Sequence, residues 1–458
     1  MSDAMTVTKT YNTQDLVNKD KAHMLHPMSN LAQLREHGPL VMCKGEDVFL
    51  WDTDGKKYID AFAGLWNINI GHGRGELADV AAEQMREVAF VPNFFALNSP
   101  PTIELAAKLA QMMPGDLNHF QFTSGGAESN ETAIKFARYY WSVQGKSDKI
   151  KVLSRQMGYH GIAMGALSAT GIPGYWEHFG PRPPGFLHLT PPYDYRHGEG
   201  LNEEQFVDKL VKELEETIER EGADTIAAFI GEPVQGAGGL VVPPQSYWQR
   251  ISEVLKKHDI LLIFDEVITG FGRTGTMFGA EQYGVTPDIA SFAKGVTSGY
   301  IPLGGVGVSD KIFDVMSAQD KPFMHGFTYS GHPVATAVAL KNIEIIEREN
   351  LPKNAAENGE YMLNELKKLY DKPYVGNVRG KGLMMLVEYV TNKETKEKFD
   401  PSLKVGPKLE AATRERGIIV RATPDGVAMS PPLTIQKSEI DTVVSELTDA
   451  MDEVFGSL

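Results

Sequence analysis

Cysteine is almost absent from this chain of 458 residues, and long hydrophobic runs are missing altogether. The lone Cys43 excludes an internal disulfide framework and any zinc site built from cysteines. No apolar run approaches the roughly 18 residues of a membrane-spanning helix, and the densest, Ile260 to Phe264, has the length of a strand. The N-terminal residues lack the basic and apolar regions of a secretion signal. We therefore expect a cytoplasmic protein without a membrane segment.

Basic side chains are also in the minority. The chain has 45 Lys and Arg against 60 Asp and Glu, a formal net charge of −15. A surface that binds nucleic acid or an anionic membrane needs a basic face, so neither is expected as a partner. The histidines show no spacing typical of metal ligands, and we predict no metal site.

What the chain does contain is an alternation of helical patterns with short apolar runs. Apolar residues three and four apart predict helices at 77–88, 105–112 and 128–141. Near-continuous apolar runs separated by helices indicate parallel strands covered on both faces. These runs are Val152–Leu153, Ile226–Ile230, Ile260–Phe264 and Leu303–Val308. The sequence therefore predicts an α/β fold with a mostly parallel main sheet.

The pattern changes after residue 330. Short strands at 380–390, 417–421 and 427–429 stand among long helices at 351–370, 404–416 and 437–454, which predicts a smaller α+β unit. Near the N-terminus, Asp54-Gly55 predicts the turn of a hairpin that has no obvious place in the main sheet. We predict an N-terminal segment 1–65 packed with the small domain, a large domain 66–330, and a small domain 331–458.

Three places carry residues suited to chemistry. Thr123 to Glu128 precede a helix, where free N–H groups and the helix dipole suit a phosphate, although an ordinary N-cap with Glu128 reaching back fits them at least as well. Asp265 ends the most apolar strand, at the edge where open parallel sheets bind ligands. Lys294 follows another short strand among small residues, where partial burial would lower the pKa of its amine.

Two further motifs are ambiguous. Residues 270–275 match G-x-G-x-x-G, but no long helix follows them, so we expect a folded loop at a domain or subunit contact rather than a dinucleotide site. His160, after Tyr159, could lie over an aromatic ligand or could be a core histidine satisfied by the backbone.

Taken together, these motifs resemble those of the class III (ω-) aminotransferases, which are pyridoxal 5′-phosphate (PLP) enzymes of fold type I. The similarity runs from near residue 30 to the C-terminus and is closest to the ω-amine:pyruvate aminotransferases. It implies a large domain with a mostly parallel seven-stranded sheet between helices, a smaller α+β domain, and a homodimer with active sites at its interface; pairing of two dimers stays open. The matching segments are 64–66, 125–128, 159–161, 232–236, 265–275, 293–295, 325–333 and 418–422.

The resemblance assigns catalytic roles to Lys294 and Asp265. Lys294 would bind the cofactor covalently and, once a substrate amine displaces it, move a proton between substrate and cofactor. Asp265 would pair with the pyridine nitrogen. The ring would lie between Tyr159 and Val267, and Thr328 of the partner subunit would reach the phosphate. The implied cofactor-binding set is Gly126, Ala127, Tyr159, His160, Glu232, Asp265, Val267, Lys294 and Thr328.

Substrate binding is implied at a second set of positions. Arg421 matches a mobile arginine that clamps a carboxylate and swings away from an amine that has none, although a surface arginine at a strand end is an alternative. Aromatic side chains would wall an apolar pocket, two of them across the dimer interface, although a Phe-Phe pair is often plain core. The implied set is Trp66, Phe94, Phe95, Tyr159, Ala237 and Arg421.

The chain departs from the family pattern at two positions. Ile268 replaces a common glutamine, which counts against the ornithine-type and 4-aminobutyrate-type branches, and Ala127 replaces a hydroxyl residue of the phosphate loop. The expected reaction moves an amino group from an ω-amino compound, aryl-alkyl amine or diamine to pyruvate, giving a carbonyl compound and L-alanine. The alternatives are an aminomutase or dialkylglycine-type decarboxylase, a nicotinamide oxidoreductase using the 270–275 loop, and a non-catalytic binding protein.

Overall fold

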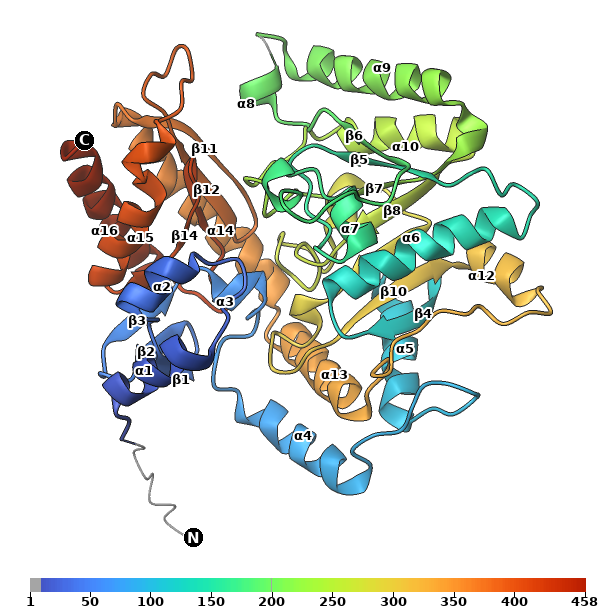
Figure 1. The fold of residues 1–458 in the computed structure, drawn as a ribbon, viewed down its shortest axis with the longest axis horizontal. Helices are drawn as coiled ribbons and strands as arrows, with labels where there is room; N and C mark the ends of the chain where they lie inside the picture. The colour runs from blue at the N-terminus through green and yellow to red at the C-terminus, as the bar shows by residue number, and fades with distance from the viewer. Residues whose placement is uncertain (1–9, 199) are drawn as a thin grey trace.

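The computed structural model describes residues 10–198 and 200–458, and a seven-stranded sheet forms its centre (Figure 1). The order is β4-β10-β9-β8-β7-β5-β6; β10 is antiparallel to both neighbours, and the remaining pairs are parallel. This confirms the mostly parallel sheet. The strands are β4 (Leu117–Thr123), β5 (Lys151–Arg155), β6 (Phe186–Leu189), β7 (Ile226–Gly231), β8 (Leu261–Asp265), β9 (Ile289–Phe292) and β10 (Gly304–Ser309).

The direction of β10 contradicts the prediction that Leu303–Val308 is another parallel strand. Parallel neighbours require a crossover of about a dozen residues or more, usually through a helix. Between β9 and β10 the chain contains only the turn Lys294–Val296 and a loop. The chain therefore returns antiparallel beside β9.

Both faces of this sheet are covered, as the apolar runs predict. On β8, Leu261 and Ile263 pack with helix α6 (Gly126–Ser142), whereas Leu262 and Phe264 pack with helices α9 (Glu203–Glu221) and α10 (Tyr247–Lys257). The predicted helices are present. Other helices of this part are α4 (Gly75–Glu87), α5 (Pro100–Met112), α7 (Met164–Ala169), α8 (Asp194–His197), α11 (Gly279–Tyr283) and α12 (Asp310–Ser317).

Helix α13 (Pro333–Arg348) leads into a second, antiparallel sheet of order β11-β12-β15-β14. The single strand predicted at 380–390 is instead the end of β11, a turn and β12. Sequence analysis missed most of β11 because it is only half-buried and carries glycine and polar residues. The elements are β11 (Val375–Lys381), β12 (Met384–Tyr389), β14 (Arg421–Ala422), β15 (Gly426–Met429), α14 (Leu351–Lys367), α15 (Val405–Glu415) and α16 (Lys437–Gly456).

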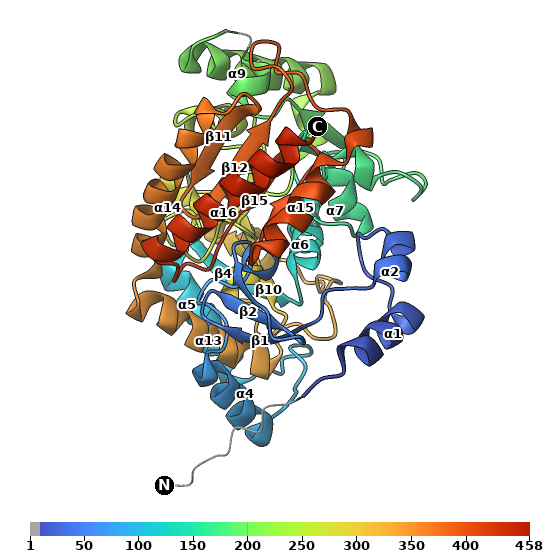
Figure 2. The same ribbon diagram turned by 90° about the vertical axis from the view of Figure 1, so that its left-hand side faces the viewer.

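The N-terminal hairpin pairs with a strand from the C-terminal part. Its strands β1 (Met42–Glu46), β2 (Phe49–Asp52) and β3 (Lys57–Asp60) are joined by β13 (Ile418–Ile419), which runs parallel to β3. Helices α1 (Thr13–His23) and α2 (Leu31–His37) lie beside this sheet (Figure 2). The hairpin and the C-terminal part are therefore joined by strand pairing.

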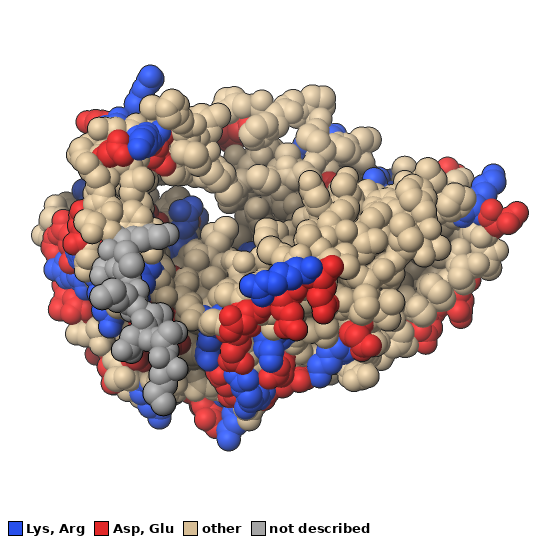
Figure 3. All heavy atoms as spheres, turned by 90° about the horizontal axis from the view of Figure 1, so that it is seen from below, with Lys and Arg blue, Asp and Glu red and all other residues tan. Residues whose placement is uncertain are grey.

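The surface is uneven in its charge. Seen from below, charged side chains gather along one edge, while a broad hollowed face carries few (Figure 3).

Among the described residues, no helix combines the length and apolarity that crossing a membrane requires.

Candidate active site

Lys294 follows strand β9 and has a positive φ of 46°. This conformation costs a non-glycine residue on the order of 1–3 kcal/mol, and such strain gathers at functional sites. Burial lowers the pKa of the Lys294 amine to about 8, although the carboxylates of Asp265 and Glu232 act to raise it. A substantial fraction of this amine is therefore neutral near pH 8, and the neutral form is the one that attacks a carbonyl group.

Asp265 ends strand β8, and its side chain is 3% exposed. Its Oδ2 accepts hydrogen bonds from Asn130 Nδ2 at 2.7 Å and from His160 Nδ1 at 2.8 Å, and its Oδ1 accepts one from the Val267 backbone at 3.1 Å. The Ser291 hydroxyl donates to Asn130 Oδ1 at 2.6 Å and so holds the amide. A buried carboxylate fixed in this way suits pairing with a protonated ring nitrogen.

The His160 ring is bonded to the catalytic-site carboxylate Asp265. The residue is 2% exposed, its Nδ1 bonds to Asp265 Oδ2, and its backbone N–H donates to Thr170 Oγ1 at 2.9 Å. The ring is therefore held by a carboxylate rather than by the backbone, while its Nε2 is buried without a hydrogen-bond partner. This geometry gives His160 a part in positioning Asp265, and its contact with the cofactor stays a prediction.

Glu232 connects two segments of the site. It is 3% exposed, and its Oε1 accepts the Tyr159 backbone N–H at 3.0 Å, while its Oε2 accepts that of Gly236 at 2.8 Å. Burial raises the pKa of the Glu232 carboxyl. The carboxylate thus holds the backbone of the Tyr159 segment and that of the turn following Gly236 in a fixed relation.

The start of α6 offers the geometry expected of a phosphate site. Gly126 and Ala127 are its first helical residues, where backbone N–H groups and the helix dipole face an anion. Glu128 reaches back and accepts the Ser124 backbone N–H at 2.8 Å, as the N-cap interpretation predicts. The N-cap residue itself is Gly125, however, and neither Thr123 nor Ser124 caps the helix with its side chain. A Cβ on Gly126 would lie 2.9 Å from Val267 Cγ1, so the helix start and Val267 are in contact.

The residues present fit PLP. The Lys294 amine, with its lowered pKa, suits the aldehyde of that cofactor. The fixed, buried carboxylate of Asp265 suits its pyridine nitrogen. The N-terminus of the 17-residue helix α6 suits its phosphate. Lys294, Asp265 and the backbone of Gly126 and Ala127 are the groups that would hold it.

Three residues of the implied substrate-binding set, Trp66, Tyr159 and Arg421, make contacts within the chain. Tyr159 meets Tyr175 edge-on, with ring centroids 5.5 Å apart. Burial raises the pKa of Tyr175, and the positive charge of Arg421 opposes this, which places Arg421 near that ring. The Arg421 side chain is 55% exposed, and its Nη1 lies 3.8 Å from Glu410 Oε1. Trp66 is buried against Phe62 with centroids 5.1 Å apart.

Four predicted residues lie on the surface or close to it. Phe95 is 93% exposed, Ala237 and Thr328 are exposed, and Phe94 is half-buried with its ring against Gly326. A single chain therefore does not build a closed pocket from these side chains. The exposed Thr328 is consistent with the expectation that it reaches the phosphate of the partner's site.

The loop at 270–275 is not a dinucleotide site. The helix that follows it, α11, has only five residues. Arg273 is fully buried within the loop and donates to the carbonyl oxygens of Leu383 and Pro431 and to Asn69 Oδ1. This confirms a folded loop at a contact with the C-terminal part of the chain.

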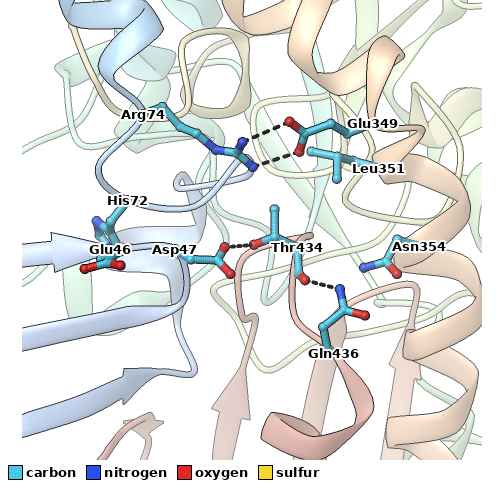
Figure 4. A pocket seen from close by; sticks show the side chains of 9 residues that line it. All are labelled: Glu46, Asp47, His72, Arg74, Glu349, Leu351, Asn354, Thr434 and Gln436. Atoms are coloured by element: carbon cyan, nitrogen blue, oxygen red, sulfur yellow. Dashed lines mark hydrogen bonds and ion pairs between the residues drawn. The ribbon is translucent and has the colours of Figure 1, made fainter.

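A cavity of about 470 Å³ lies elsewhere, between the N-terminal hairpin and the C-terminal part (Figure 4). Its charged groups bond to one another: Arg74 binds Glu349 at 2.8 and 2.9 Å, and Thr434 donates to Asp47 at 2.6 Å. Its lining shares no residue with the site around Lys294. The lining consists of Glu46, Asp47, His72, Arg74, Glu349, Leu351, Asn354, Thr434 and Gln436.

Sequence analysis missed Asn130, Ser291 and Tyr175. Asn130 lies one turn after Gly126, on the buried face of α6 that also carries Ala133 and Ala137. A polar residue on a buried face requires a partner, and this signal could have identified it. Tyr175 carries no comparable signal, because only the folded chain brings it to Tyr159.

Comparisons with known proteins find similarity to aminotransferases over nearly the whole chain. The family model described as "Aminotransferase class-III" matches residues 32–451. A putrescine–pyruvate aminotransferase of Pseudomonas aeruginosa is 42% identical over 454 residues, 99% of this chain and 98% of that protein. A thermostable (S)-enantioselective ω-transaminase from Thermomicrobium roseum is 67% identical, with a TM-score of 0.97 over 97% of this chain and 100% of that one. The ω-transaminase of Pseudomonas jessenii in complex with PMP is 42% identical, with a TM-score of 0.94 over 96% and 98%.

Proposed function

Because this chain belongs to the class III aminotransferases, PLP enzymes of fold type I, we propose that it moves an amino group from a primary amine without a carboxylate to pyruvate. The products would be a carbonyl compound and L-alanine. The observation that carries this choice is Arg421, a largely exposed arginine whose ion pair with Glu410 is long at 3.8 Å. Its positive charge acts on Tyr175, the ring that meets Tyr159 edge-on. The 42% identical putrescine–pyruvate aminotransferase supports the same direction.

PLP, when bound, supplies an electron sink for the carbon that loses or gains the proton. Lys294 would supply the amine that holds the cofactor and, once freed as a neutral amine, would take a proton from the substrate carbon and deliver it to the cofactor. Asp265, fixed by Asn130 and His160, would keep a proton on the pyridine nitrogen. The helix start at Gly126 would hold the phosphate through backbone N–H groups.

Two unlike substrates must use one site in turn. Pyruvate and alanine carry a carboxylate, which the Arg421 guanidinium can bind in a bidentate manner. An aryl or alkyl amine carries none, so the arginine must leave and aromatic side chains must cover the apolar group. The Arg421 side chain is 55% exposed and its ion pair with Glu410 is long at 3.8 Å, and both features favour such a change of position.

The proposal includes a cytoplasmic homodimer. Phe95, Met324 and Tyr329 are 93%, 88% and 62% exposed, an unusual exposure for large apolar side chains. A second copy of the chain that covers them would also bring Thr328 and Phe95 toward the partner's site. A catalytically competent monomer in sedimentation experiments would contradict this part of the proposal.

The visible absorption spectrum of the purified protein tests the function. We expect a yellow band that 1-phenylethylamine bleaches and pyruvate restores, since each addition drives one half-reaction. Bleaching by alanine but by no carboxylate-free amine would contradict the amine specificity and leave the cofactor assignment intact. A protein that stays colourless with added PLP would contradict the whole proposal, and Lys294→Ala provides the matched control for covalent binding.

A further inference from the structure

A buried charged cluster lies outside the catalytic site, around Glu388 on strand β12. Glu388 is 3% exposed and accepts hydrogen bonds from the Tyr193 hydroxyl, from Arg196 Nε at 2.8 Å and from Arg379 Nη1 at 2.7 Å. Two guanidinium groups therefore share one carboxylate. Buried charges are costly unless their remaining donors are satisfied, so the other N–H groups of both arginines must bind elsewhere.

The two arginines direct these remaining donors to different places. Arg379, on strand β11, donates from Nε to Gly239 O at 3.1 Å and Leu240 O at 2.6 Å, and also from Nη2 to Gly239 O. Arg196 donates instead to the carbonyl oxygen of Lys396. Only Arg379 therefore connects the cluster to residues 236–240.

Residues 236–240 form a turn that is held at both ends. Its first residue donates its N–H to Glu232 Oε2, and Leu240 N–H donates to Gly236 O at 2.9 Å. A Cβ on Gly238 would lie 1.7 Å from Met157 O, so only glycine fits there. The exposed residue of this turn is Ala237.

We propose that Arg379, with Glu388 as its counter-ion, is a positioning residue that fixes the 236–240 turn and thereby sets the place of Ala237 beside the substrate. The inference rests on the proposed function, because it takes Ala237 as part of the substrate site. The planar guanidinium binds Glu388 along one edge and two carbonyl oxygens along another, which a lysine ammonium cannot reproduce.

Hydrogen exchange of the holoenzyme tests the first half of this proposal. In Arg379→Lys we expect the peptide covering 233–243 to exchange roughly tenfold faster, the effect of one lost charge-assisted hydrogen bond. Arg196→Lys is the matched control, since it changes the same cluster without touching the turn. Unchanged exchange in Arg379→Lys, or equal acceleration in both variants, would overturn the proposal. Asn377→Ala, which removes another acceptor of Arg379 at 2.9 Å, is a milder second variant with the same expected direction.

Steady-state kinetics with a large and a small amine test the second half. The ratio of kcat/KM for 1-phenylethylamine to that for isopropylamine should fall roughly tenfold in Arg379→Lys, because only the larger amine reaches the wall that Ala237 forms. The visible spectrum should stay unchanged, and Arg196→Lys should keep the wild-type ratio. An unchanged ratio with accelerated exchange would overturn the role in specificity. Failure of the proposed function itself would appear differently, as a wild-type protein that no amine bleaches.

Discussion

Replacing Lys294 with methionine is expected to stabilise the cofactor-free protein at neutral pH. The pKa of the amine is about 8 in the folded protein against an ordinary value of 10.5, because burial disfavours its charged form. Below pH 8 the amine is charged in both folded and unfolded chains, and the folded state carries the full cost of burying it. Above pH 10.5 the amine is neutral in both, and the cost is absent. The penalty is therefore lost as pH rises from 8 to 10.5.

The size of the penalty follows from the two pKa values. Their difference lowers the free energy of unfolding by about 3 kcal/mol at pH 7 and by about 1.4 kcal/mol at pH 9.5. The positive φ of 46° at this residue is a second cost, but it does not depend on pH and persists in the methionine variant. The pH dependence of the stability thus separates the cost of burying the charged amine from the cost of the backbone conformation.

Thermal unfolding of the PLP-free proteins measures this difference. Lys294→Met should unfold at a higher temperature than the wild type at pH 7, and the gap should narrow by about half at pH 9.5. The control is Lys321→Met at an exposed lysine, which should show no such gap at either pH. Equal midpoints at pH 7, or a gap that does not narrow, would refute the inference that a desolvated amine occupies the site.

Four further substitutions probe the two sides of the site. Arg421→Leu should reduce kcat/KM for pyruvate roughly 10²-fold through loss of a bidentate ion pair, while single-turnover bleaching by 1-phenylethylamine stays nearly unchanged; equal losses would contradict a selective carboxylate clamp. Asn130→Ala should weaken PLP binding roughly tenfold in an absorbance titration, because the catalytic carboxylate loses a donor at 2.7 Å, and an unchanged Kd would count against that role. Gly126→Ala should also weaken PLP binding, since its Cβ would press on Val267, whereas Ala127→Ser should strengthen it by adding a hydroxyl donor; the same Kd in both would exclude a phosphate site there.

The placement of Asp265 and Lys294 could be predicted because strand ends collect at one edge of a parallel sheet. Asp265 and Lys294 each follow a short apolar run, and β8 and β9 are neighbours in the sheet. The hairpin around Asp54-Gly55 could be predicted equally well, since a turn dipeptide between apolar residues is a local signal. Where the local structure depends on one residue and its immediate neighbours, the sequence pattern was sufficient to predict it.

The groups that hold those residues in place could not be predicted in the same way. Asp265 is fixed by partners 135 and 105 residues earlier in the chain, and the 236–240 turn by an arginine 140 residues later. No spacing rule connects such positions, because the contact exists only after the sheet and the C-terminal part have assembled. The predicted direction of β10 was wrong for a related reason. The direction depends on the connection before the strand, whereas the apolar run of β10 is compatible with either direction.

The origin of these supports divides the site into two halves. The bonds to Asp265 come from Asn130, His160 and Val267, all within the part of the chain that builds the seven-stranded sheet. The residues proposed for the substrate side, Arg379 and Arg421, come instead from the antiparallel sheet beyond residue 330. Substitutions in the C-terminal part should therefore change substrate preference with little effect on PLP affinity, and substitutions around Asp265 should do the reverse. Glu232 is bonded to both the Tyr159 segment and the 236–240 turn, so a single change at Glu232 should disturb both halves together.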